Sequence, residues 1–277
     1  MKLFGIDFTS SPSQRKPITV SVGEMKNSIL YPKDIISLHS FETFERFLHQ
    51  NSPYIMAIDF PFSLPHQWLQ DMNWPLNWHH YVSLFENMSI EEFTSHIKIY
   101  RDKQPKGKKY HLREIDKLAK SCSPMMIDYI PVGRMFFKGA PILKRSGAYI
   151  PIHQNKTDSR CRLIVEGYPA LITRRIIGKT PYKSDIKSKQ TSAQKNTRAE
   201  IMHHILKQHL EIEFGYQVDI HSNLIPSFIN DPTGDKLDSL LCLLQATWLY
   251  QHGYHKERGL KHIQRFTEGW IADPQFM

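Results

Sequence analysis

The sequence predicts an α/β fold in which a mixed β-sheet is flanked by helices. Two nearly continuous apolar runs, residues 54–60 (YIMAIDF) and 162–168 (RLIVEGY), are typical of strands that are buried on both faces. Elsewhere, apolar residues recur at the three- and four-residue spacing of helices. The predicted order is three strands, a helix, a fourth strand, a long insertion, a fifth strand and then helices. Such an order is typical of α/β proteins.

The N-terminal part accounts for the first four strands and the first helix. Residues 2–8 (KLFGIDF) are a short apolar run that ends beside an acid, and residues 18–22 alternate between apolar and polar side chains, as strands do. Residues 28–31 predict a third strand, and phenylalanines at helical spacing predict a helix over residues 41–50. The fourth strand, residues 54–60, must end at the prolines that follow it, because proline cannot donate to a β-ladder.

Residues 66–160 are expected to form a largely helical insertion within one domain that covers residues 1–277. The insertion is rich in Trp, Asn and Pro, and Ser89 with Glu92 forms a capping box that predicts the start of a helix. Its aromatic side chains can stack on nucleic-acid bases or form a small core, and the core is favoured. These aromatics are Trp68, Trp74, Trp78, Tyr81 and Phe85. After the fifth strand, three helices are predicted at residues 169–178, 192–210 and 233–252.

Composition excludes several classes of protein. Of the 277 residues, 40% are hydrophobic and 23% are charged, which excludes a wholly disordered chain. The apolar stretches fall short of the ~20 residues that span a bilayer, and Asp7 interrupts the first one before a signal peptide can form. The three cysteines are widely spaced and match neither a disulfide framework nor a zinc motif. We therefore expect a cytoplasmic protein without a membrane partner.

The positive charge is concentrated in two segments. The net charge is +9, from 36 Lys and Arg against 27 Asp and Glu. Residues 101–120 hold eight basic and three acidic residues, and residues 174–198 hold eight basic residues and one acid, Asp185. Two such segments on a mildly acidic body suggest a polyanionic partner, of which nucleic acid is the commonest. Solvated lysine-rich loops are the alternative interpretation.

Five acids are candidates for one functional site. Asp7, Asp59 and Glu166 lie at or near the ends of predicted strands, inside apolar runs where an unpaired charge is costly. If these strands are parallel neighbours, their carboxyl ends share one edge of the sheet, where α/β proteins bind ligands. Asp235 and Asp238 lie three residues apart on the last predicted helix, and Asp238 borders its apolar stripe.

A cluster of carboxylates needs cations to neutralise it. Hard oxygen ligands select Mg²⁺ or Mn²⁺, and two such ions are a known device for phosphoryl transfer. Local structural roles remain open for three of the acids. Asp7 and Asp59 can serve as turn formers, and Asp235 can be an acid that the dipole favours at a helix N-terminus. Glu166 has no such local role within a strand.

Four motifs, GIDF, AIDFPFSLP, VEGYPALI and GDKLDSLLCLLQA, occur here in the order that they have in the uncharacterised domain family 429. That family is a group of predicted nucleases with the RNase H fold, and residues 131–137 (PVGRMFF) also resemble it. The segment from Asp235 to Asp238 resembles the last-helix motif of RuvC-type Holliday-junction resolvases, which share the fold. The predicted insertion far exceeds an RNase H connection, so the resemblance does not indicate a substrate class.

The resemblance assigns a role to each acid. It implies an RNase H-like sheet in which Asp7 and Asp59 are the metal ligands of the first and fourth strands. Asp238 is then the ligand of the last helix, with Asp235 beside it, and Glu166 is a family-specific acid on the fifth strand.

A nuclease that hydrolyses phosphodiesters by a two-metal mechanism is the function that these features favour. Asp7, Asp59, Glu166 and Asp238 are its expected catalytic acids. The basic segments are expected to hold the nucleic-acid backbone through Lys106, Lys108, Lys109, Arg113, Arg174, Arg175, Lys183 and Lys187. One alternative is an actin-like phosphotransferase or ATPase, but the glycine-rich phosphate turn that it needs is missing after Asp7. A non-catalytic nucleic-acid or protein-binding module is the other, and it does not require a metal.

Overall fold

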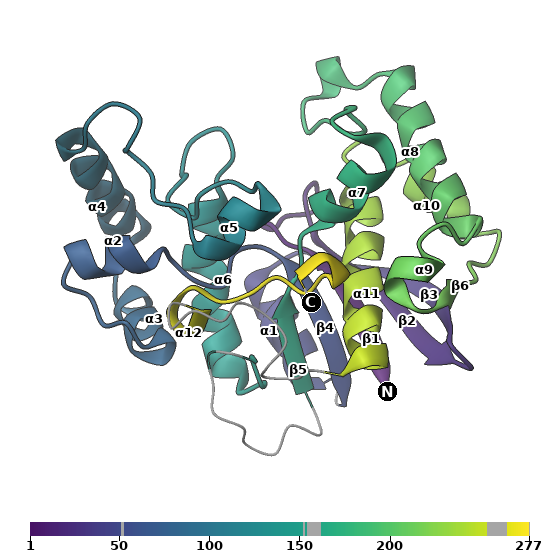
Figure 1. Cartoon of the computed structure of the whole chain (residues 1–277), viewed down its shortest axis with the longest axis horizontal. Coiled ribbons are helices and arrows are strands. Elements are labelled where there is room, and N and C mark those ends of the chain that lie inside the picture. Colours follow the sequence, from purple (N-terminus) through teal and green to yellow (C-terminus); the bar gives the residue numbers. More distant parts are fainter. Residues whose placement is uncertain (51–52, 152, 154–161, 254–264, 277) are drawn as a thin grey trace.

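A six-stranded mixed sheet forms the centre of the computed structural model, which describes residues 1–50, 53–151, 153, 162–253 and 265–276. The strands are β1 (Lys2–Asp7), β2 (Ile18–Lys26), β3 (Ile29–Leu38), β4 (Tyr54–Asp59), β5 (Arg162–Glu166) and β6 (Gln217–Val218). Their order across the sheet is β5-β4-β1-β2-β3-β6, and helices pack on both faces (Figure 1). The predicted α/β class and mixed sheet are confirmed.

The sheet register decides which strand-end acids can meet. β1 is parallel to β4 and β4 to β5, whereas β2 is antiparallel to both of its neighbours, β1 and β3. The carboxyl ends of β1, β4 and β5 therefore lie at the same edge. Asp7 is directly opposite Asp59, but Glu166 is opposite Ile58. Successive side chains of a strand point to opposite faces, so Glu166 projects from the face opposite to Asp59.

The long helix α11 (Asp235–His252) covers one face and passes very close to β1. A Cβ atom added to Gly5 would lie 1.9 Å from the backbone nitrogen of Leu243 and 2.1 Å from the carbonyl oxygen of Ser239. Only glycine permits this approach. The Ser239 hydroxyl also bonds the Ser21 hydroxyl of β2 at 2.7 Å, which fixes the start of the helix against the sheet.

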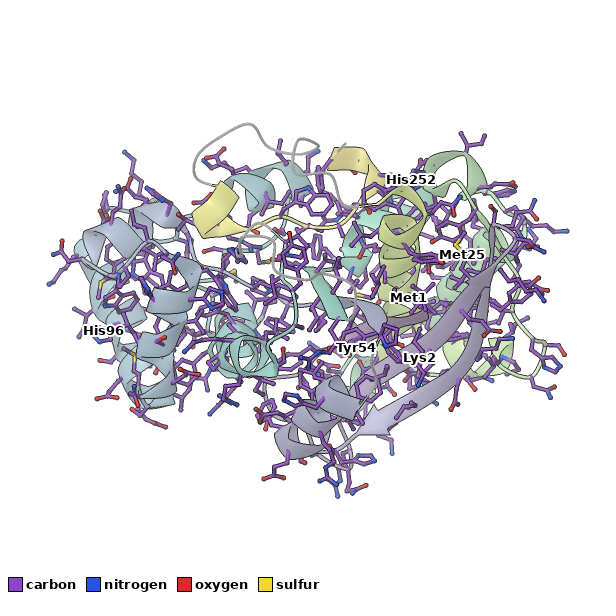
Figure 2. All side chains as sticks on the ribbon, turned by 90° about the horizontal axis from the view of Figure 1, so that it is seen from below. Met1, Lys2, Met25, Tyr54, His96 and His252 are labelled. Atoms are coloured by element: carbon purple, nitrogen blue, oxygen red, sulfur yellow. The ribbon has the colours of Figure 1, made fainter. Side chains whose placement is uncertain are left out.

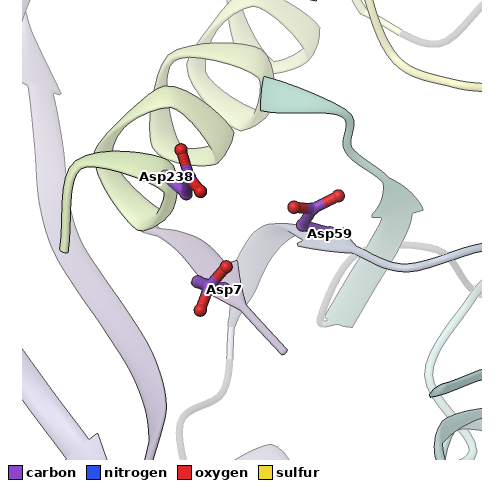
Figure 3. A group of neighbouring side chains, drawn as sticks. All are labelled: Asp7, Asp59 and Asp238. Carbon is purple, nitrogen blue, oxygen red and sulfur yellow. The ribbon is translucent and has the colours of Figure 1, made fainter. Parts of the chain in front are cut away.

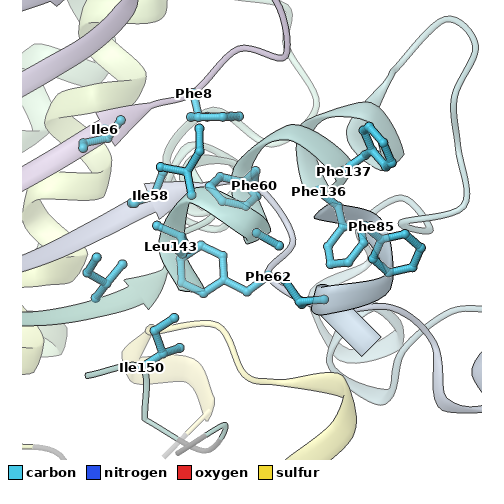
Figure 4. Packing of buried hydrophobic residues seen from close by; sticks show 14 of the residues in the cluster. Ile6, Phe8, Ile58, Phe60, Phe62, Phe85, Phe136, Phe137, Leu143 and Ile150 are labelled. Carbon is cyan, nitrogen blue, oxygen red and sulfur yellow. The ribbon is translucent and has the colours of Figure 1, made fainter. Parts of the chain in front are cut away.

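The other face packs against α1 (Phe41–Gln50), α6 (Val132–Ser146) and the rest of the insertion. The other helices in the described part of the insertion are α2 (His66–Asp71), α3 (Trp78–Glu86), α4 (Ile90–Lys103) and α5 (Glu114–Ala119). Phe8 and Phe60 from the sheet side and Phe85 and Phe136 from the insertion belong to one continuous core (Figure 4). The insertion therefore shares the core of the sheet.

The insertion aromatics belong to this core, as the sequence favoured. Trp68, Trp78, Tyr81 and Phe85 are at most 2% exposed, so they are not available for base stacking. Seen from below, His96 on α4 lies at one end of the molecule and Met25, near the end of β2, toward the other (Figure 2).

Several helices and strands differ in extent from the prediction. Besides α11, the described helices after the fifth strand are α7 (Pro169–Ile177), α8 (Ser192–Leu206), α9 (Glu211–Phe214), α10 (Ile225–Ile229) and α12 (Arg265–Glu268), with 3₁₀ turns at Lys187–Lys189 and Pro274–Phe276. The helix predicted over residues 192–210 ends at Leu206, β3 extends to Leu38, and the two-residue β6 was not predicted. Within the described ranges, no helix has both the length and the hydropathy to cross a membrane.

Candidate functional site

Three of the predicted acids meet at the carboxyl edge of the sheet. Asp7 ends β1, Asp59 ends β4 and Asp238 lies in the first turn of α11. One carboxylate oxygen from each lies within 4.8 Å of the other two, and Figure 3 shows the three side chains around a common space. The register places Asp7 beside Asp59, and the close approach at Gly5 brings the helix acid to them.

Burial and mutual repulsion oppose the simultaneous ionisation of these three carboxyl groups. Burial raises the pKa of Asp7 well above its usual value, and the charges of Asp235, Asp238 and Asp59 raise it further, whereas Lys183 lowers it. Burial likewise raises the pKa of Asp59 to about 7, and Asp238 adds to the effect. A divalent cation would relieve this repulsion and favour the ionised carboxylates.

Asp238 has two partners from the segment between α7 and α8. The Tyr182 hydroxyl donates to one carboxylate oxygen at 2.6 Å, and the Lys183 ammonium contacts the other. Burial alone would lower the pKa of Lys183, but Asp238 and Tyr182 outweigh it and raise the pKa well above its usual value. The Lys183 side chain is still 38% exposed, so it has room to move. The sequence predicts that Lys183 contacts nucleic acid, whereas the structure pairs it with Asp238 of the cluster.

Asp235 lies beside the three acids at the start of α11. It is buried and lines the same cleft, but its carboxylate is not one of the three that share the 4.8 Å space. Burial raises the pKa of Asp235 to about 6, and the charge of Asp231 contributes. Asp231 itself caps the helix by accepting the Lys236 amide at 2.9 Å. Asp235 therefore has a supporting position rather than a central one.

Glu166 is separated from the cluster, in contrast to the prediction that it is a metal ligand. Its two oxygens accept hydrogen bonds from Arg113 at 2.6 and 2.8 Å, and one also accepts the Phe62 amide at 3.0 Å. Burial raises the pKa of Glu166, although Arg113 opposes the shift. The one-residue difference in register between β4 and β5 is the physical reason, because it turns Glu166 to the other face of the sheet.

Arg113 was predicted to contact nucleic acid, but the structure shows that it is a buried cation. It is 1% exposed and also binds Asp116 through two hydrogen bonds of 2.9 and 2.8 Å. Arg175 is likewise drawn inward, where two bonds of 2.7 and 3.0 Å join it to Asp273. Asp116 is only three residues from Arg113, but Glu166 and Asp273 lie 53 and 98 residues from the arginines that they bind, so these two pairings leave no local signal in the sequence.

The other basic candidates remain accessible to different degrees. Arg174 is partly buried and donates to the Ala119 carbonyl at 2.7 Å and to the Tyr168 hydroxyl at 3.1 Å. The side chains that are exposed are Lys106, Lys108, Lys109 and Lys187.

A cleft of about 410 Å³ opens above the acids. Asp7, Asp59 and Asp235 are among its acidic lining residues, and Lys16 and Arg174 are among its cationic ones. Asp116, Glu166 and Asp185 also line it. Apolar side chains from the start of α6, including Val132 and Met135, line it as well. Residues of the insertion and of the segment between α7 and α8 both line the cleft.

Comparison with known proteins gives no relative: no protein-family model, no curated protein and no solved structure matches this chain. A functional assignment therefore depends on the site itself.

Proposed function

We propose that this protein is a nuclease that depends on Mg²⁺ or Mn²⁺ and hydrolyses the phosphodiester bonds of nucleic acid. The observation that carries the proposal is the meeting of Asp7, Asp59 and Asp238 beside an open cleft. Three carboxylates are hard oxygen donors of the kind these ions prefer, and no hydrogen-bond donor contacts the Asp7 or Asp59 carboxylates among the residues described. The donor set therefore fits a divalent cation.

The topology supports the RNase H-like fold that the sequence resemblance implies. β1 lies inside the sheet with β4 parallel to it, and the final long helix crosses β1. Such an arrangement allows ligands on the first strand, the fourth strand and the last long helix to meet. The three acids that meet are those that the resemblance assigns to these elements.

The acidic and basic residues of the site would have different roles. Asp7, Asp59 and Asp238 would hold the metal, which activates water and stabilises the leaving oxygen when it is bound. Arg174 lines the cleft and is placed to attract a phosphate. The exposed lysines Lys106, Lys108, Lys109 and Lys187 would add affinity that is independent of sequence.

A non-catalytic binding module is the second candidate, and one contact favours it. The Lys183 ammonium already neutralises Asp238, so the cluster can exist without a metal. An actin-like phosphotransferase has no comparable support, because residues 8–12 (FTSSP) follow β1 without a glycine.

The test is cleavage of labelled single-stranded and duplex DNA and RNA with Mn²⁺, with Mg²⁺ and with a chelator. We expect metal-dependent cleavage that Asp59→Asn reduces by roughly 100-fold or more, since loss of even an outer partner of a metal ligand costs ~10–100-fold. Glu24→Gln is the matched control, because Glu24 lies near the end of the strands opposite to Asp7 and its ion pair among the described residues is with exposed Lys33. Cleavage that persists in chelator, or that Asp59→Asn leaves intact, contradicts the proposal.

A further inference from the structure

The metal-binding acids lie deep rather than on an open surface. Asp7 and Asp238 are buried, and Asp59 is only partly exposed. A scissile phosphate must therefore enter the cleft to reach them. The cleft, at about 410 Å³, is in the range of ~300–1,000 Å³ that is typical of pockets for single small ligands. A nucleotide is a ligand of this size, whereas a base-paired duplex is much wider.

The lining of the cleft suits the parts of a nucleotide. Ile130, Val132 and Met135 give it an apolar wall, against which a base can pack. Tyr168 and Arg174 also line it, and the Arg174 guanidinium lies 5.4 Å from the centre of the Tyr168 ring. Burial raises the pKa of Tyr168 to about 12, so its hydroxyl keeps its proton at neutral pH and can donate to a phosphate oxygen.

An exposed tyrosine stands next to this apolar wall. Tyr129 is fully exposed and immediately precedes Ile130, which lines the cleft. Its φ of +56° is in the left-handed region that favours glycine, and the Ile130 amide closes a tight turn by donating to the Asp128 carbonyl at 2.6 Å. Among the described residues, none packs on the ring to explain a tyrosine at this position. Exposed aromatic rings are a common platform on which unpaired bases stack.

We infer that the cleft binds a nucleotide of an unpaired nucleic-acid strand, with Tyr129 at its lip as a stacking platform for a base and Arg174 as a phosphate anchor. This inference rests on the proposed nuclease function, because it takes the acid cluster as the place of the scissile phosphate. Bases of a duplex are stacked and paired, so a duplex would have to open before a nucleotide could enter. Single strands carry no such cost.

Binding selectivity tests the inference separately from cleavage. A fluorescent single strand of about 15 nucleotides, long enough for a typical single-strand site, is titrated with the full chain in Ca²⁺, and the blunt duplex of the same sequence is titrated in parallel. We expect the single strand, as DNA or as RNA, to bind at least about tenfold more tightly than the duplex at the same salt concentration. Equal or tighter binding of the duplex would overturn the inference even if the protein proves to be a nuclease. Single-strand preference without any cleavage would support the inference and leave the nuclease proposal refuted.

Tyr129→Gly tests the stacking platform without threatening the fold. Glycine suits the positive φ and the side chain is fully exposed, so the melting temperature should not fall. Loss of one stacked base should weaken single-strand binding by about 5- to 100-fold. Tyr250→Ala is the matched control, since this exposed tyrosine lies fifteen residues after Asp235, about 22 Å further along α11. Unchanged affinity in Tyr129→Gly, or an equal loss in Tyr250→Ala, would overturn the role assigned to Tyr129.

Discussion

Arg113→Met should destabilise the protein strongly, because Arg113 is the cation that compensates two buried carboxylates. Its guanidinium makes two bonds of 2.6 and 2.8 Å to Glu166 and two of 2.9 and 2.8 Å to Asp116. All three side chains are at most 4% exposed. Methionine keeps much of the volume but removes the charge and every donor. Two carboxylates would then remain in the interior without a counter-charge.

The size of this loss follows from the geometry. Removing one partner of a buried ion pair costs about 3–5 kcal/mol, and Arg113 serves two acids, so the upper part of this range is expected. At roughly 2–4 °C per kcal/mol for a chain of about this length, a loss of about 4–5 kcal/mol should lower the melting temperature by about 8–20 °C. The free energy of unfolding from urea titrations at pH 5 and pH 8 is the measurement.

The loss should also depend on pH. Burial already raises the pKa of Glu166 above its unfolded value, and removal of Arg113 will raise it further. Protonated Glu166 contributes stability that is present below its unfolded pKa and is lost as the pH rises through its folded pKa. The mutant should therefore be closer to wild type at pH 5 than at pH 8, and a second substitution, Glu166→Gln, should restore part of the stability at pH 8.

Arg145→Met is the control, because Arg145 pairs with Glu45 at the surface, where both side chains are at least 32% exposed. A loss of about 1 kcal/mol or less is expected there. If Arg113→Met costs no more than this control, or costs the same at both pH values, the buried triad does not have the role we give it.

Three further predictions concern the acid cluster and its supports. Gly5→Ala should lower the free energy of unfolding by about 3 kcal/mol or more and weaken Mn²⁺ binding, because the new methyl group meets the α11 backbone. In Gly23→Ala the nearest atoms to the new methyl group are side-chain atoms, at 3.0 Å, so a larger loss of stability there than in Gly5→Ala would contradict this. Without metal, the melting temperature should fall from pH 5 to pH 8, because the stability from protonated Asp59 is lost as the pH rises through its pKa of about 7. Mn²⁺ affinity should rise over the same interval. An unchanged melting temperature would refute the raised pKa of Asp59. Lys183→Met should raise Mn²⁺ affinity about tenfold, because the cation that competes for Asp238 is gone, and it should lower the stability of the metal-free protein. Weaker Mn²⁺ binding by calorimetry would contradict this and show that Lys183 supports the metal instead.

Much of the sheet could be predicted because its strands have local signals. The apolar runs of β4 and β5 and the alternation in β2 mark these elements without reference to any partner. β6 could not be predicted, since two residues carry no periodicity and the strand exists only through its pairing with β3. α11 was predictable from its apolar stripe and from Gly253, which ends it, and its observed start at Asp235 is two residues after the predicted start.

The candidate site was predictable only where position along an element decides contact. Asp7 and Asp59 are strand-end acids and Asp238 borders the apolar stripe of its helix, so their meeting was predicted on the condition that β1 and β4 are parallel neighbours, as they are. Glu166 has the same local pattern, but its face depends on the register between strands, which the sequence does not reveal. Lys183 also looked like any lysine of a basic loop, because its partner lies 55 residues away.

Binding of Mn²⁺ to the metal-free protein, followed by calorimetry and by melting temperature, tests the central claim most directly. We predict that wild type binds Mn²⁺, releases protons because the pKa values of Asp7 and Asp59 are raised, and gains thermal stability. Asp7→Asn should lose this binding while its metal-free form is at least as stable as wild type, because one of the repelling carboxylates is gone. Glu24→Gln should behave like wild type. A wild-type protein that gains no stability from Mn²⁺, or an Asp7→Asn variant that gains as much as wild type, would contradict the assignment of this cluster as a metal site.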